Sequence, residues 1–167
     1  MRVRRYACPH LHHGQCCTGG MPLEGQYEPS TQAWVRDQVE LIESSGGTKG
    51  TDLRGMPVVI VTNRGVKSGM LRKTPLMRVE HEGTYAAVAS QGGAPEHPSW
   101  YYNLLADPHV EVQDGPLKGD YVARQITGDE KRVGWRRAVE AFPPYREYQA
   151  RTKRDIPVFL LEPVASD

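Results

Sequence analysis

The stretch Val58-Val59-Ile60-Val61-Thr62-Asn63, followed by Arg64-Gly65-Val66-Lys67-Ser68-Gly69, carries the strongest indication of the fold. Its first half is a run of β-branched residues, which is typical of a buried strand. Its second half is a glycine-flanked turn, which predicts that the chain reverses into a second strand over residues 70–80. A hairpin turn at residues 81–83 and a third strand over residues 84–90 complete a pattern of antiparallel β-structure.

The rest of the chain alternates helical and extended patterns. A helix is expected from Pro29 to the glycines at 46–47, with an apolar stripe formed by Trp34, Val35, Val39, Leu41 and Ile42. Further helices are expected at residues 99–106, 129–141 and 145–151, and further strands at 109–113, 121–126 and 158–161, with a turn over 114–119. The predicted fold class is mainly β with covering helices (α+β), an antiparallel barrel forming a single domain over residues 21–167.

Charge and hydropathy exclude several classes of protein. The formal net charge of +1 gives no global field for nucleic acid. The apolar runs at 56–61 and 85–89 are far shorter than the roughly 20 residues of a membrane span. The basic start is not followed by the apolar region of a signal peptide. We therefore expect a cytoplasmic protein without a transmembrane segment, and peripheral contact with the inner face of the membrane stays open.

Residues 1–20 differ from the rest of the chain because they contain all three cysteines and a cluster of histidines. We interpret them as a disordered leader, or as upstream sequence that precedes a functional start at Met21. The alternative is a metal site, whose ligands would be Cys8, His10, His12, His13, Cys16 and Cys17. Their spacing fits none of the usual patterns, so no metal is predicted.

The sequence lacks a Walker loop, a strand-linked G-x-G-x-x-G, a G-x-S-x-G and an H-E-x-x-H motif. These absences favour a protein whose reactivity comes from a bound cofactor. The turn at 65–69 can present backbone N–H groups to an anion, with Lys67 and Arg72 adding positive charge. Arg72 and Thr74 share one face of an extended strand. From spacing alone, a solvated hairpin turn explains this segment somewhat better.

Other segments carry weaker signals. The glycines in Ser90-Gln91-Gly92-Gly93-Ala94-Pro95 let the backbone approach a ligand, although a simple chain reversal explains them equally well. Trp100 and Asn103 share a face of the next helix. Phe142, Tyr145 and Tyr148 form an aromatic stripe that would suit a quinone, with a tyrosine hydroxyl as proton donor. Such stripes belong more often to the core.

Taken in order, these segments resemble the deazaflavin-dependent nitroreductase and quinone reductase family of actinobacteria. The resemblance covers about residues 30–163. The matching segments are residues 56–62, 65–76, 89–94, 98–108, 145–149 and 156–158.

The resemblance implies a split β-barrel of the FMN-binding-like type that binds coenzyme F-420, an 8-hydroxy-5-deazaflavin with a phosphate and a glutamate tail. Lys67, Ser68, Gly69 and Arg72 would hold the phosphate side, with Thr74 and Pro75 lining the ring. Ser90, Gln91, Gly92, Gly93 and Ala94 would run along the cofactor, and Trp100 with Asn103 would close the pocket. Phe142, Tyr145 and Tyr148 would contact the acceptor, with Tyr145 and Ser90 as candidate catalytic residues.

The expected function is therefore hydride transfer from reduced F-420 to a quinone or similar small acceptor, including a membrane quinone. Relative to the family pattern, Val66 replaces a basic residue, Gln91 a lysine and Phe142 a hydroxyl-bearing residue, and Met77 is not tyrosine. The first two replacements remove potential contacts to an anionic cofactor. An FMN- or haem-type split barrel and a non-catalytic F-420 carrier are the alternatives. A homodimer is left open, since no exposed stripe demands one.

Overall fold

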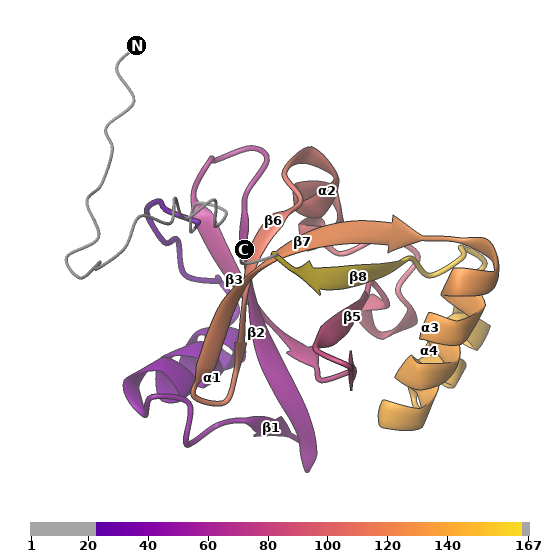
Figure 1. Ribbon diagram of the computed structural model, residues 1–167, viewed down its shortest axis with the longest axis horizontal. Coiled ribbons are helices and arrows are strands. Elements are labelled where there is room, and N and C mark those ends of the chain that lie inside the picture. The colour runs from indigo at the N-terminus through magenta and orange to yellow at the C-terminus, as the bar shows by residue number, and fades with distance from the viewer. Residues whose placement is uncertain (1–22, 165–167) are drawn as a thin grey trace, which may run out of the picture.

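The computed structural model describes residues 23–164, so the expectations for residues 1–20 lie outside the described residues. The helices are α1 Ala33–Ser44, the short 3-10 turn η1 Gln91–Gly93, α2 Ser99–Ala106, α3 Gly128–Ala141 and α4 Tyr145–Arg151 (Figure 1). The strands are β1 Asp52–Leu53, β2 Met56–Arg64, β3 Leu71–Met77, β4 Glu80–His81, β5 Thr84–Val88, β6 His109–Asp114, β7 Leu117–Ile126 and β8 Val158–Pro163. Among the helices of this part of the chain, none combines the length and the apolar content needed to span a bilayer.

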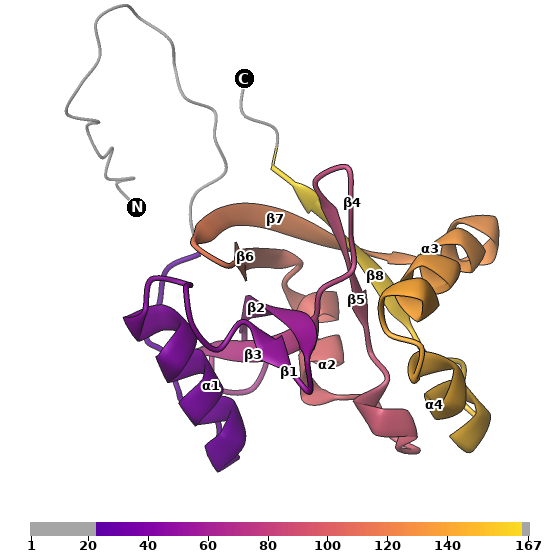
Figure 2. The same ribbon diagram turned by 90° about the horizontal axis from the view of Figure 1, so that it is seen from below.

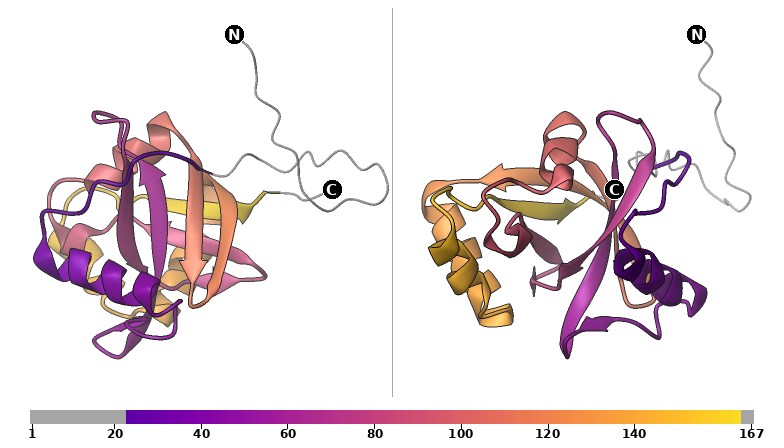
Figure 3. Two further views of the ribbon diagram at one scale, coloured as in Figure 1. Left: turned by 90° about the vertical axis from the view of Figure 1, so that its left-hand side faces the viewer. Right: turned by 180° about the vertical axis from the view of Figure 1, so that it is seen from behind.

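The strands form one antiparallel sheet in the order β1-β2-β6-β7-β8-β5-β4, with β3 paired to β2. The sheet curls on itself, so that β6 and β7 run beside β2, whereas β8 runs across the direction of β2 (Figure 3). Between residues 23 and 164 no ladder joins β3 to β5, so the barrel is left open along this line. The antiparallel barrel predicted from the hairpin pattern is confirmed, and its open side places β3 opposite the segment that follows β5.

The alternation along β2 explains how the barrel is filled and covered. Val59 and Val61 point into the main core cluster of the barrel. Val58 and Ile60 point the other way and pack against Val39 and its neighbours on α1. Successive strand residues face opposite sides of a sheet, so a continuous apolar run requires cover on both sides. The β-branched run therefore explains both the filled barrel and the position of α1 on its outer face.

Helices α3 and α4 lie at the end of the molecule opposite α1 (Figure 2). They pack against β5, β7 and β8 through a second buried cluster, which includes Val88, Ile126, Ala138 and Val158. Helix α2 packs on the barrel through Trp100 and Leu104. The helices thus lie on both sides of the open line between β3 and β5.

The apolar stripe predicted for α1 is too wide. Trp34 and Leu41 are 51% and 45% exposed, whereas Val35, Val39 and Ile42 are buried. Positions 35, 39 and 42 follow the helical repeat, which brings residues three and four apart onto one face. Trp34 and Leu41 lie beside this face, and the exposed Trp34 is free for another role.

Several predicted boundaries are wrong. The strand expected over 70–80 ends at Met77. The hairpin turn expected at 81–83 is confirmed, since His81 pairs with Thr84 and both Glu82 and Gly83 have positive φ. The turn expected over 114–119 consists only of residues 115 and 116, because Asp114 pairs with Leu117 across a two-residue hairpin. The short strand β1 was not predicted. The predicted bounds of α2 and α4 are confirmed.

Candidate active site

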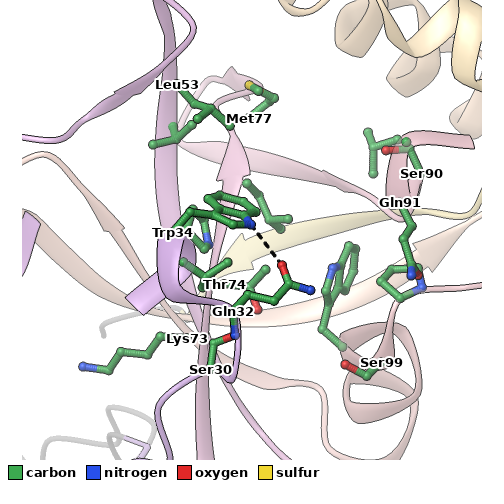
Figure 4. A pocket seen from close by; sticks show the side chains of 18 of the residues that line it. Ser30, Gln32, Trp34, Leu53, Lys73, Thr74, Met77, Ser90, Gln91 and Ser99 are labelled. Carbon is green, nitrogen blue, oxygen red and sulfur yellow. Dashed lines mark hydrogen bonds between the residues drawn. The ribbon is translucent and has the colours of Figure 1, made fainter. Parts of the chain in front are cut away.

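A cavity of about 490 Å³ lies at the open side of the barrel. Its walls come from β3, the start of α1, the loop after β5, α2, and the aromatic residues at and before α4. Figure 4 shows Trp34, Gln32 and Thr74 facing Ser90 and Gln91 across this space. Ligand pockets in proteins have volumes of about 300–1,000 Å³, so the cavity is large enough for a small-molecule cofactor.

Most of the predicted site residues share this cavity. Those that line it are Arg72, Thr74, Pro75, Ser90, Gln91, Gly92, Trp100, Asn103, Phe142, Tyr145 and Tyr148. Those outside its lining are Lys67, Ser68, Gly69, Gly93 and Ala94. The structure therefore brings the predicted cofactor and acceptor residues to one place, with the anion-binding turn adjoining it.

The charged end of the cavity is built by β3. Arg72 points to the cavity, and its Nη1 atom lies 2.8 Å from Oε2 of Glu28. Lys73 has the opposite orientation, away from Thr74 (Figure 4), and forms an ion pair with Glu43 of α1. This alternation follows from the two-residue period of a strand. Lys73 also borders the cavity, but its ammonium is paired with Glu43, so Arg72 is the β3 cation that faces the same side as Thr74.

The turn at 65–69 adjoins Arg72 but is already largely hydrogen bonded. Gly65 N–H donates to the Met70 carbonyl at 2.8 Å, and Gly69 N–H donates to the Gly65 carbonyl at 2.8 Å. Among residues 23–164 the backbone N–H groups of Lys67 and Ser68 have no hydrogen-bond partner. The N–H groups that remain available for the predicted anion-binding nest are therefore these two.

Asn103 connects the turn to the barrel. Its Oδ1 accepts a hydrogen bond from Val66 N–H at 3.0 Å, and its Nδ2 donates to Oδ1 of Asn63 at 2.8 Å. Asn63 is fully buried near the end of β2, and Asn103 is 6% exposed. Asn63 was not predicted as a site residue, although a polar side chain at the end of an apolar run was a visible signal.

Replacing Asn103 by leucine should lower the free energy of unfolding by about 1–3 kcal/mol, because the buried amide of Asn63 and the N–H of Val66 would lose their partner. Urea denaturation measures this change. Tyr102→Phe is the control, since Tyr102 lies on the same helix and is 51% exposed. Equal stability of the leucine variant and wild type would show that Asn103 does not hold the turn.

The loop after β5 adopts an unusual backbone conformation. Gln91, Gly92 and Gly93 have consecutive positive φ values of 45°, 64° and 81°. A Cβ atom on Gly93 would lie 2.6 Å from the Tyr148 carbonyl oxygen, so this glycine permits close packing on α4. Positive φ at a non-glycine residue such as Gln91 is strained and persists where the surroundings enforce it. The strained residue lines the cavity.

The aromatic end of the cavity is formed by Phe142, Tyr145 and Tyr148. The ring centroids of Phe142 and Tyr145 are 4.9 Å apart, and those of Tyr145 and Tyr148 are 6.2 Å apart. The predicted stripe is therefore one cluster, but it is not one helix, because α3 ends at Ala141 and α4 begins at Tyr145. The break follows from the prolines between them, which cannot continue a helix.

Tyr145 is the most buried of the tyrosines at the cavity, with 5% of its surface exposed. Burial, and to a smaller extent the nearby Tyr148, raise the pKa of Tyr145 well above its usual value. The hydroxyl makes no hydrogen bond to any residue of the described part of the chain. Tyr145 thus presents a neutral O–H group, a hydrogen-bond donor, at the wall of the cavity.

Trp34, Gln32 and Met77 also line the cavity, and none was predicted to do so. The Trp34 indole N–H donates to Oε1 of Gln32 at 3.1 Å, which fixes the ring at the start of α1 (Figure 4). No local pattern distinguished Trp34 from a core residue of the helix. Its position becomes meaningful only when α1 is placed beside β3.

Comparison with known proteins identifies the family. The model of the F-420H(2)-dependent quinone reductase family matches residues 34–163. The chain belongs to this family. The resemblance noted in the sequence is confirmed, as is the classification as an oxidoreductase. The open antiparallel barrel agrees with the split-barrel fold that the resemblance implies. Members of the F-420H(2)-dependent quinone reductase family use reduced F-420 as the reductant and are named for a quinone acceptor.

Individual relatives agree with this assignment. An F-420H(2)-dependent quinone reductase of Mycobacterium tuberculosis is 34% identical over 108 residues, covering 63% of this chain and 72% of the relative. A solved structure described as an F-420-H2 dependent reductase (FDR-A) is 55% identical, with a TM-score of 0.61 and coverage of 64% of this chain and 94% of that one. A structure described as a domain-swapped dimer is 51% identical, with a TM-score of 0.64 and coverage of 80% and 100%.

Proposed function

We propose that this member of the F-420H(2)-dependent quinone reductase family binds reduced F-420 in the cavity at the open side of its barrel. We further propose that it reduces a quinone beside Tyr145. The observation that carries the proposal is the polarity of the cavity, which has a cationic end at Arg72 and an aromatic end at Tyr145. An anionic cofactor and an apolar acceptor can therefore lie in line within one space.

The residues at the cationic end fit a phosphate. Arg72 offers a planar guanidinium, and the free N–H groups of Lys67 and Ser68 lie on the adjoining turn. The ammonium of Lys67 and the backbone of Gly69 would complete the anion site. Nη1 of Arg72 is paired with Oε2 of Glu28 at 2.8 Å, so a bound phosphate would have to displace this carboxylate from the guanidinium.

The remaining walls would enclose the ring system. Thr74 and Pro75 would line one side, and Ser90 through Ala94 the other, with Trp100 closing the pocket above Asn103. Reduced F-420, when bound, supplies a hydride from carbon C5 of its deazaflavin ring. The protein's contribution is to hold the ring against the acceptor and to exclude water.

The acceptor would lie against Phe142 and Tyr148, whose rings provide apolar surface. Reduction of a quinone requires a hydride and a proton, and the proton must reach the oxygen that gains negative charge. The Tyr145 hydroxyl would supply it, a role supported by its position in the cavity lining and by the burial that keeps it protonated. Ser90, across the cavity, would orient the acceptor or the ring through its hydroxyl.

Binding of F-420 to the Lys67→Ala plus Arg72→Ala variant tests the proposed cofactor site. The loss of two charge-assisted contacts should raise the Kd of F-420 by about 100-fold or more, measured by quenching of deazaflavin fluorescence. Lys118→Ala removes an exposed lysine from β7 and should leave the Kd unchanged. Absence of binding to the wild-type protein at micromolar F-420 would contradict the proposal.

The same titration separates the remaining alternatives. Tighter binding of FMN than of F-420 would assign this chain to a flavin-dependent reaction. Tight binding of F-420 without turnover of menadione or other quinones would identify a carrier. The phosphate-binding groups favour neither outcome. The hydroxyl of Tyr145, which borders the cavity and has no hydrogen-bond partner among residues 23–164, favours catalysis, since a carrier has no need of a proton donor.

A further inference from the structure

Arg154 lies in the segment between α4 and β8, and its guanidinium forms hydrogen bonds with the loop after β5. Its Nη2 donates to the Ser90 carbonyl at 2.8 Å, and its Nε donates to the Ala94 carbonyl at 2.9 Å. Its Nη1 contacts both the Ala89 carbonyl at 3.1 Å and Nδ1 of His97 at 3.0 Å. One side chain thus holds both ends of the loop that contains the strained Gln91.

Within residues 23–164 the charge of Arg154 is not paired with a carboxylate, since none of the ion pairs there includes it. Burial lowers the pKa of Arg154 from its usual value, but an arginine remains protonated in proteins. Its partners are carbonyl oxygens and a histidine, whose pKa is lowered first by burial and then by Arg154 itself. A positive charge therefore lies directly behind the Ser90 wall of the cavity.

The segment that carries Arg154 is also hydrogen bonded to α4, the helix that carries Tyr145. Gln149 of α4 donates from Nε2 to the Arg154 carbonyl at 2.8 Å, and its Oε1 accepts from Ile156 N–H at 3.0 Å. On the other side of the loop, Gly93 packs against the backbone of Tyr148. The loop carrying Ser90 and the helix carrying Tyr145 are thus connected through one short segment, by side-chain hydrogen bonds at each end.

We propose that Arg154 is a positioning residue for the reaction: it holds the Ser90 loop at a fixed separation from the Tyr145 helix. This inference rests on the proposed function of the two walls. Cofactor and acceptor must approach closely for hydride transfer, and a misplacement of about 1 Å can cost 100-fold in rate. A guanidinium suits this task because its planar fork can bind several carbonyl oxygens in one geometry.

Hydrogen exchange in the cofactor-free protein tests directly whether Arg154 holds the loop after β5. The amides of Gly93 and Ala94 donate within the loop, to the Ser90 and Gln91 carbonyls at 2.9 and 3.1 Å. In Arg154→Gln they should exchange at least tenfold faster than in wild type, whereas the amides of β2 and β6 keep their protection. Lys153→Gln, which removes an exposed neighbouring charge, is the control. Unchanged protection of the loop would overturn the inference.

Kinetic measurements show whether the contacts of Arg154 with the loop affect the reaction. Arg154→Gln should lower kcat/KM for menadione by about tenfold or more and raise the Kd of F-420, with Lys153→Gln unchanged. Arg154→Lys keeps the charge but not the fork, so it should fall between wild type and Arg154→Gln, and it serves as the test variant if Arg154→Gln fails to fold. A loosened loop with unchanged kinetics would overturn the positioning role. Wild-type protein that binds no F-420 would refute the proposed function, and with it the positioning role. The exchange result would still decide whether Arg154 holds the loop.

Discussion

Replacing Tyr145 by phenylalanine should lower kcat for quinone reduction by about 100-fold or more, the effect expected when a positioned proton donor is removed. The ring would still fill its place among Phe142, Tyr148 and Trp135, so the fold should be preserved. The Kd of F-420 should remain unchanged, because the proposed phosphate site at Arg72 lies at the other end of the cavity. Steady-state kinetics with a water-soluble quinone and a fluorescence titration of F-420 measure both quantities.

Tyr148→Phe is the matched comparison, because it removes a hydroxyl from the same helix. This variant should change KM for the quinone more than kcat, since Tyr148 is expected to contact the acceptor without supplying the proton. Equal losses of kcat in both variants would show that the hydroxyls act together. An unaltered kcat in Tyr145→Phe would exclude Tyr145 as the donor and leave Ser90 or solvent as the source of the proton.

Gly93→Ala should be strongly destabilising and should also abolish quinone reduction. The added methyl group would lie 2.6 Å from the Tyr148 carbonyl oxygen, and φ at this position is +81°. Overpacking against backbone and a left-handed conformation together should cost about 2–5 kcal/mol of unfolding free energy. Urea denaturation measures the loss of stability. The quinone assay measures the loss of activity that is expected when the Ser90 loop is displaced from α4.

Gly92→Ala separates the steric contribution from the conformational one. Gly92 also has a positive φ of +64°, but a methyl group there meets nothing within 4 Å. Its substitution should therefore cost only about 1–2 kcal/mol of stability, the penalty for left-handed backbone alone. If both alanine variants lose the same stability, the close contact between Gly93 and α4 contributes nothing to the fold.

Local signals predicted the elements whose boundaries are set within the chain itself. The run at 58–63 predicted β2, and Asp107-Pro108 predicted the end of α2 at Ala106. The predicted length of the turn at 114–119 was wrong because its residues are compatible with either a long loop or a tight hairpin. Only the pairing of Asp114 with Leu117 decides between them. Strand register depends on the partner strand, which a single segment does not reveal.

Site residues could be predicted where they belong to a continuous sequence motif. They could not be predicted where their role depends on contacts between residues far apart in the sequence. Arg72, Ser90 and Tyr145 were predicted from the family resemblance, and all line one cavity. Arg154 contacts Ser90 across 64 positions of the sequence, and Asn63 contacts Asn103 across 40. Neither residue lies in a pattern with a recognised chemistry, because each acts through a neighbour that the fold brings to it.

The open line between β3 and β5 has a consequence for self-association. An unpaired strand edge is a template on which another chain can add a strand. The first part of β3 is covered, since Leu71 N–H donates to the Gln26 carbonyl at 2.8 Å and its own carbonyl accepts from Glu28 N–H at 2.9 Å. Farther along the edge stands Pro75, which has no N–H to offer an incoming strand. The edge beside the cavity can thus stay open to small molecules while resisting the edge-to-edge pairing that leads to aggregation.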